Sequence, residues 1–214
     1  MTGIPWLLAC TIVRDTFRFF LCAALTGLAI KIMDDWLDIS RDRCDGDTPP
    51  GPGPDLVSRL GDASLPYALL LFACAVPIDG RTAVALFLMA YAAGMGGASS
   101  RDLYPSGLRG WQESVVSALI SWVACGWRVT AVAGLCMACI QGFDDVMDYG
   151  EGGARAAPLV GRFGIVEVAA VAAAMALLSL ALDIPRTAGI LTAAVFVWRL
   201  ESALRKGRRP PGML

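Results

Sequence analysis

The sequence predicts an all-α polytopic membrane protein of about seven transmembrane helices, packed as a bundle in one domain over residues 1–214. Two properties of the composition support this fold class. Hydrophobic residues make up 56% of the chain and charged residues only 17%, whereas about a quarter of a soluble domain is charged. The apolar residues also fall into repeated runs, which favours several spans over a single anchor. We therefore expect the lipid bilayer to surround most of the chain.

The apolar runs divide into seven predicted helices, separated by glycine, proline or charged residues. They cover residues 17–38, 65–78, 82–97, 112–125, 128–148, 165–182 and 187–200. A full span requires roughly 20 residues. The short segments are therefore expected to be tilted or packed deep within the protein.

The basic residues predict how the bundle is oriented in the membrane. If the seven helices alternate in direction, one side receives Arg41, Arg43, Arg59, Arg101, Arg109, Arg155, Arg162, Arg205, Lys206, Arg208 and Arg209. The other side receives Arg14, Arg81, Arg128 and Arg186. The side richer in Lys and Arg faces the cytoplasm, which predicts a multi-pass protein of the cytoplasmic membrane. The net charge of −1 gives no support for a nucleic-acid partner.

A weak internal repeat accompanies this pattern. The motif Asp-Asp-x-x-Asp ends a predicted helix at 34–38 and again at 144–148. Each copy is followed by a loop on the basic side and by two apolar helices. The sequence therefore predicts a first repeat over about 17–97 and a second over about 128–200, with a site at the interface between them.

The aspartates of each motif are spaced to share one face of a helix. Asp34, Asp38 and Asp42 recur every four residues and form one stripe, with Asp35 beside it. In the second motif the shared face carries two aspartates, four residues apart, and Asp145 follows the first of them. The full second set is Asp144, Asp145 and Asp148, with Glu151 one turn further.

Such clusters need a compensating charge near a membrane. Carboxylates four residues apart weaken a helix, and one aspartate at the centre of a membrane helix costs about 2.5–3.5 kcal/mol. Mg²⁺ prefers oxygen ligands and binds one or two carboxylates together with substrate phosphates. The alternative is that both clusters are solvated helix ends. We predict that Asp34, Asp35, Asp38, Asp42, Asp144 and Asp148 bind Mg²⁺, and that these six residues and Asp145 are catalytic.

Basic and hydroxyl residues near the clusters are candidates for binding a diphosphate. Lys31 lies inside a predicted span, where an ionisable residue is a functional candidate, although an ion pair within its own helix would also explain it. Arginine binds phosphate through its bidentate fork, but a loop arginine also fits a purely topogenic role. The candidates are Lys31, Arg101, Tyr104, Arg109 and Arg162.

The two acidic motifs resemble those of the UbiA superfamily of intramembrane prenyltransferases. The first motif of that family is Asn/Asp-Asp-x-x-Asp-x-x-x-Asp, and residues 34–42 match it position by position. The second is Asp-x-x-x-Asp, which Asp144 and Asp148 fit. The family often continues with Arg-x-Gly, similar to Arg162-Phe-Gly164, and often has a tyrosine and a basic residue between the motifs, as at Tyr104 and Arg109.

The resemblance implies a reduced UbiA-like bundle around a central cavity. Magnesium and a prenyl diphosphate would bind at the cytoplasmic end, with the isoprenoid tail among the helices. Members of the family usually have more spans and a longer chain. Here the helix before the first motif is expected to be missing or reduced to residues 4–13.

Three functions are compatible with these features. The first is transfer of a prenyl group to a lipophilic or aromatic acceptor. The second is a UbiA-type terpene cyclase, which needs the same metal cluster but no acceptor, and in which aromatic side chains would stabilise a migrating cation. The third is a non-enzymatic cation carrier, but carriers place such sites near the middle of the membrane, whereas these motifs lie at helix ends.

Overall fold

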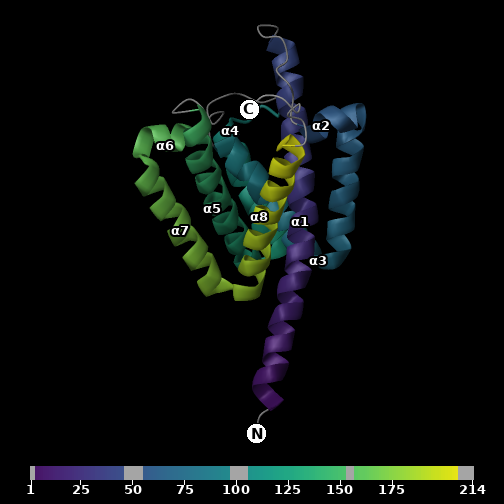
Figure 1. Ribbon diagram of the computed structural model, residues 1–214, viewed down its shortest axis with the longest axis vertical. Coiled ribbons are helices and arrows are strands. Elements are labelled where there is room, and N and C mark those ends of the chain that lie inside the picture. Colours follow the sequence, from purple (N-terminus) through teal and green to yellow (C-terminus); the bar gives the residue numbers. More distant parts are fainter. Residues whose placement is uncertain (1–2, 46–54, 97–105, 153–156, 207–214) are drawn as a thin grey trace.

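The computed structural model describes residues 3–45, 55–96, 106–152 and 157–206, and these residues are helical almost throughout. The elements are α1 (Gly3–Asp45), α2 (Asp55–Leu60), η1 (Gly61–Ala63), α3 (Ser64–Gly96), α4 (Gly110–Cys125), α5 (Trp127–Gly152), α6 (Pro158–Phe163), α7 (Ile165–Leu182) and α8 (Ile184–Lys206). Helix α1 packs against α3 and α8, while α5 packs against α3 and α7. The long helices run side by side as a bundle (Figure 1).

Helix α3 is a hairpin of two helices. The backbone leaves the helical region at Asp79 (φ −156°, ψ 89°), and the chain reverses there (Figure 1). The Asp79 carboxylate accepts a hydrogen bond from the backbone N–H of Thr82 at 2.9 Å. It therefore caps the second half of α3, because a side-chain oxygen satisfies one of the free N–H groups at a helix start.

Helices α7 and α8 form a second hairpin with the same kind of turn. The Asp183 carboxylate accepts from the backbone N–H of Arg186 at 3.1 Å and forms an ion pair with its guanidinium at 2.6 Å. The Arg186 Nε also donates to the Thr82 hydroxyl at 3.1 Å, which ties the two turns together. Arg18 on α1 forms an ion pair with Asp79 at 2.5 Å. One end of the bundle is therefore held by two Arg–Asp pairs.

The structure bears out the predicted helical segments and the helical membrane character. Each of the seven predicted segments lies within a helix, apart from residue 97, which falls outside the described residues. Among the described residues, five helices are long and apolar enough to cross a membrane. The number is smaller than seven because 65–78 and 82–97 are the two halves of α3, and α4 has only 16 residues. Seven spans remain a prediction.

The first helix is much longer in the structure than the sequence predicts. Helix α1 has 43 residues, which is about 65 Å at 1.5 Å per residue. No glycine or proline interrupts the chain between residues 6 and 26, so the apolar stretch at 4–13 continues α1. The expectation was that a separate preceding helix is missing or reduced to residues 4–13, and the structure agrees with its first alternative, because residues 4–13 are the start of α1.

Small residues bring α1 and α8 into close contact. A Cβ atom added at Gly189 would lie 2.7 Å from the Phe19 Cβ and 2.8 Å from the Phe20 backbone nitrogen. Next to this crossing is a buried core to which α1, α3, α5 and α8 all contribute, with Ala23, Leu86, Val132, Cys136 and Ile190 among its members. The backbones of the two helices leave no room for a side chain between them.

We expect Gly189→Ala to lower the free energy of unfolding by about 1–3 kcal/mol, because the added methyl group must displace helix backbone. Gly150→Ala is the matched control, since a Cβ there meets nothing within 4 Å. Thermal unfolding of both variants in detergent measures the difference. Equal stability of the two variants would contradict the close crossing.

Candidate functional site

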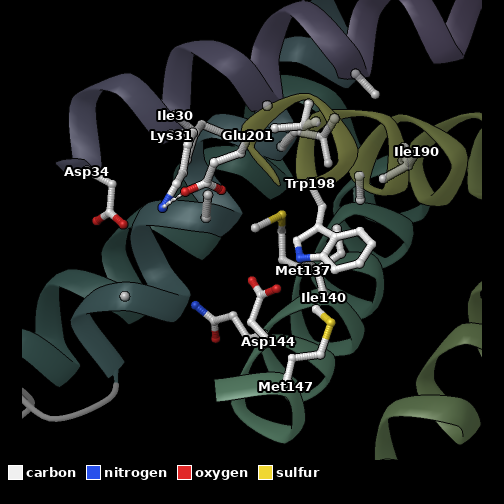
Figure 2. Close-up of a pocket in the computed structure, with 18 of the residues that line it drawn as sticks. Ile30, Lys31, Asp34, Met137, Ile140, Asp144, Met147, Ile190, Trp198 and Glu201 are labelled. Carbon is white, nitrogen blue, oxygen red and sulfur yellow. Dashed lines mark ion pairs between the residues drawn. The ribbon is translucent and has the colours of Figure 1, made fainter. Parts of the chain in front are cut away.

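A cavity of about 740 Å³ lies between α1, α3, α5 and α8. Figure 2 shows that Asp34 on α1 and Asp144 on α5 face it from opposite sides. Asp148 lines it one turn beyond Asp144. The structure therefore brings residues of both acidic motifs to one hollow, although the motifs are 110 positions apart in the sequence.

The cavity is polar at one end and apolar at the other. Its lining segments of α1, α5, α8 and the second half of α3 all run towards the same end of the bundle, which is the upper end in Figure 1. Each begins with an apolar residue, and these residues are Ala23, Leu86, Met137 and Ile190. The segments of α1, α5 and α8 finish with Asp34, Asp148 and the pair Glu201 and Ser202. We call these the inner end and the mouth of the cavity.

Lys31 is held at the mouth by two carboxylates. Its ammonium lies 3.0 Å from Asp35 Oδ1 on the same helix and 3.8 Å from Glu201 Oε1 on α8. The Asp35 side chain is only 9% exposed, whereas 35% of the Lys31 side chain is exposed. The intrahelical ion pair considered as an alternative is therefore present, and Lys31 also lines the cavity. An ammonium has three N–H donors, so it can hold both carboxylates and still meet a ligand.

The mouth carries an excess of negative charge. Asp34, Asp144, Asp148 and Glu201 all line the cavity, and Lys31 is the single basic residue among the described residues that do so. Water screens such an excess poorly where side chains are partly buried. The arrangement therefore favours a ligand that is cationic or is accompanied by a cation.

Other predicted site residues lie outside the cavity. The Asp145 carboxylate accepts a hydrogen bond from the backbone N–H of Leu159 at 3.1 Å, so it ties α5 to the start of α6. Arg109 immediately precedes α4. Arg162 lies in the last turn of α6 with its guanidinium 5.2 Å from the Phe163 ring centre. These three residues are not part of the cavity lining.

Four predicted residues cannot be placed at the site. Arg101 and Tyr104 fall outside the described residues. Asp38 and Asp42 lie on α1 beyond Asp34, but only their backbone is described. Their assignment to the metal site stays a prediction.

Glu201 and Trp198 were not among the predicted site residues. Both lie on α8 and line the cavity. Glu201 carries a signal that could have been used, because it follows the long apolar stretch of α8 and an acid inside a membrane helix is a functional candidate. No comparable signal separates Trp198 from the other tryptophans.

The carboxylates at the mouth fit only one kind of metal site. Among the described residues, no three acidic, thiol or imidazole groups converge as a closed metal site. Mg²⁺ does not need one, because it takes one or two carboxylates and completes its shell with waters and phosphate oxygens. Asp34, Asp144 and Asp148 supply such oxygens at the mouth. They fit an ion shared with a phosphate and do not fit an ion held by protein ligands alone.

We expect Lys31→Met to lower the free energy of unfolding by about 2 kcal/mol, because it leaves the buried Asp35 carboxylate without its cation. The double variant Lys31→Met/Asp35→Asn should recover most of the loss. Arg14→Met is the control, since its ion pair with Asp15 spans 3.5 Å and Arg14 is 78% exposed, where such pairs contribute little. Denaturant titration in detergent measures all three, and an additive double variant would contradict the coupling.

No family model, curated protein or solved structure matches this chain. The resemblance to the UbiA superfamily therefore rests on the two aspartate motifs and on their spacing. The cavity is a separate observation, made from the geometry of the helices. It joins the two motifs whatever the ancestry of the chain.

Proposed function

We propose that this protein is a magnesium-dependent membrane enzyme that ionises a prenyl diphosphate and transfers the prenyl group to a lipophilic or aromatic acceptor. The observation that carries the proposal is a cavity that is apolar at its inner end and lined at its mouth by carboxylates from both aspartate motifs. A prenyl diphosphate has the same two parts as this cavity, because it combines an apolar hydrocarbon tail with a charged head that binds divalent cations.

Each end of the cavity binds a different part of the proposed substrate. The tail lies against Ala23, Leu86 and Ile190, where burial of apolar surface contributes about 0.8 kcal/mol per CH₂ group. The diphosphate lies at the mouth beside Lys31, whose ammonium donates to phosphate oxygens. The carboxylates of Asp34, Asp144 and Asp148 hold the magnesium that accompanies the diphosphate. Bound magnesium neutralises charge on the leaving group.

The proposed reaction has two steps, which are ionisation of the prenyl diphosphate and capture of the resulting allylic cation by the acceptor. The bond between the allylic carbon and the diphosphate oxygen breaks, and its electron pair leaves with the diphosphate, which Lys31 helps to hold. An electron pair of the acceptor forms the new carbon bond, and the acceptor loses a proton to water. The apolar walls exclude water from the allylic cation until the acceptor reacts. By the positive-inside rule, the mouth faces the cytoplasm.

One observation favours the cyclase alternative. Trp198 lines the cavity, whereas Trp111, Trp122 and Trp127 are not part of its lining, and all four indoles are partly exposed. An indole face next to the reacting chain would stabilise a carbocation by cation–π attraction. A cyclase would capture the cation with a double bond of the same chain. It would use the same mouth and the same carboxylates.

Incubation of the purified protein with magnesium and prenyl diphosphates, without acceptor, separates the candidates. A cyclic or rearranged hydrocarbon identifies a cyclase. Slow hydrolysis that becomes transfer when a lipophilic aromatic acceptor is added identifies a transferase. Absence of diphosphate release under every condition would refute both and leave the cation carrier.

We expect Asp34→Asn and Asp144→Asn each to reduce diphosphate release by at least about a hundredfold, because each removes a carboxylate on which the metal-bound diphosphate depends. Asp62→Asn is the control, since Asp62 is an exposed aspartate of η1 outside the cavity. Release is measured by a coupled assay at several magnesium concentrations. Wild-type activity in either cavity variant, with the protein folded, would contradict the assignment.

A further inference from the structure

We propose that the inner end of the cavity is a closed floor that limits the length of the prenyl chain the protein accepts, with Ala23, Leu86 and Ile190 as the residues that form it. The inference rests on the proposed function and adds a substrate limit to it. It follows from where the cavity stops and from what lies beyond.

The floor residues belong both to the cavity and to the packed core. Ala23, Leu86 and Ile190 line the cavity. The same three are only 5%, 3% and 2% exposed and pack with Val132 and Cys136 in one buried cluster. Protein cores have few voids larger than a water molecule. A chain that reaches these residues therefore meets close-packed side chains.

The space beyond the floor is sealed by helix backbone and by ion pairs. Gly189 precedes the floor residue Ile190, and the close approach of α8 to Phe19 and Phe20 occurs at Gly189. Just past it, Arg186 links Asp183 to Thr82, and its guanidinium lies 4.6 Å from the Phe19 ring centre. A hydrocarbon chain cannot pass between α1 and α8 without breaking these contacts.

The distance from floor to mouth is set by rigid helices. Ala23 and Asp34 are eleven positions apart on α1, and Ile190 and Glu201 are eleven positions apart on α8. Either interval corresponds to about 16 Å along a helix. A chain whose head is fixed at the mouth therefore has a fixed depth to fill, and each further isoprene unit must fold back or leave the cavity.

A larger side chain at position 27, which is Gly27 in this protein, would move the floor towards the mouth. Gly27 lines the cavity one turn above Ala23. A Cβ atom at this position would meet only the Val197 Cγ2 atom, at an ordinary contact distance of 3.6 Å. A larger side chain at position 27 can therefore be accommodated by the backbone and would fill cavity space next to Val197.

The test compares the full-length wild type with Gly27→Leu, which raises the floor, and Ile190→Ala, which deepens it. Diphosphate release from geranyl, farnesyl and geranylgeranyl diphosphates gives the ratio of kcat/KM between chain lengths. Thermal stabilisation by non-hydrolysable analogues of the same three lengths gives a second readout that does not depend on turnover. Val132→Ala is the matched control, because it truncates a residue of the same buried cluster that does not line the cavity.

We expect Gly27→Leu to shift the long-to-short ratio towards short chains by about tenfold or more, and Ile190→Ala to shift it towards long chains, because one methylene unit in an apolar pocket changes discrimination by this order. Val132→Ala should leave the ratio unchanged while lowering the melting temperature. Unchanged ratios in the two floor variants, with turnover intact, would overturn the floor and leave the proposed function standing. Length-dependent stabilisation without turnover in any protein would support the floor and refute the proposed chemistry.

Discussion

The ion pairing of Lys31 is the interaction on which the mouth of the cavity depends. An isolated carboxylate or ammonium in a membrane helix is costly, so the buried Asp35 requires a cation within its own helix, and Lys31 lies one turn away. The same ammonium lies within 3.8 Å of Glu201 on α8. One side chain thus neutralises a buried acid, joins α1 to α8, and positions positive charge beside Asp34 in the cavity wall.

Charged side chains are arranged differently at the two ends of the bundle. At the turn end, Arg18 pairs with Asp79 and Arg186 with Asp183, and these two ion pairs tie helices together. At the mouth, the described part of the chain lines the cavity with four carboxylates and a single ammonium. The cost of removing an ion from water is repaid only when the ion has its partners, so the two ion pairs at the turn end suit a structural role. The unbalanced end suits a ligand that brings cations with it.

The sequence was sufficient to locate the long apolar helical segments, because apolar runs and breakers are local signals, but it did not predict α2, α6 or the full length of α1. The turns at Asp79, Gly126 and Asp183 lie between predicted segments. The sequence does not show which helices pack against each other across the bundle. Its periodicity indicates which face of a helix is apolar, but not which helix that face contacts. Glu201 carried a local signal, as an acid within an apolar helix, but its approach to Lys31 of α1 is visible only in the fold. Asp145 was grouped with its neighbours, and only the fold reveals that its carboxylate accepts from Leu159 in α6.

The hydrogen bond from Arg186 to Thr82 also decides how the molecule can move. Both helical hairpins are fastened together at their turns, and α1 is fastened to them by Arg18. Rigid helices that are joined at one end can separate only at their other end. At that other end α1 and α8 are joined by the 3.8 Å contact between Lys31 and Glu201, so this contact must open before the two helices can spread about the fastened turns.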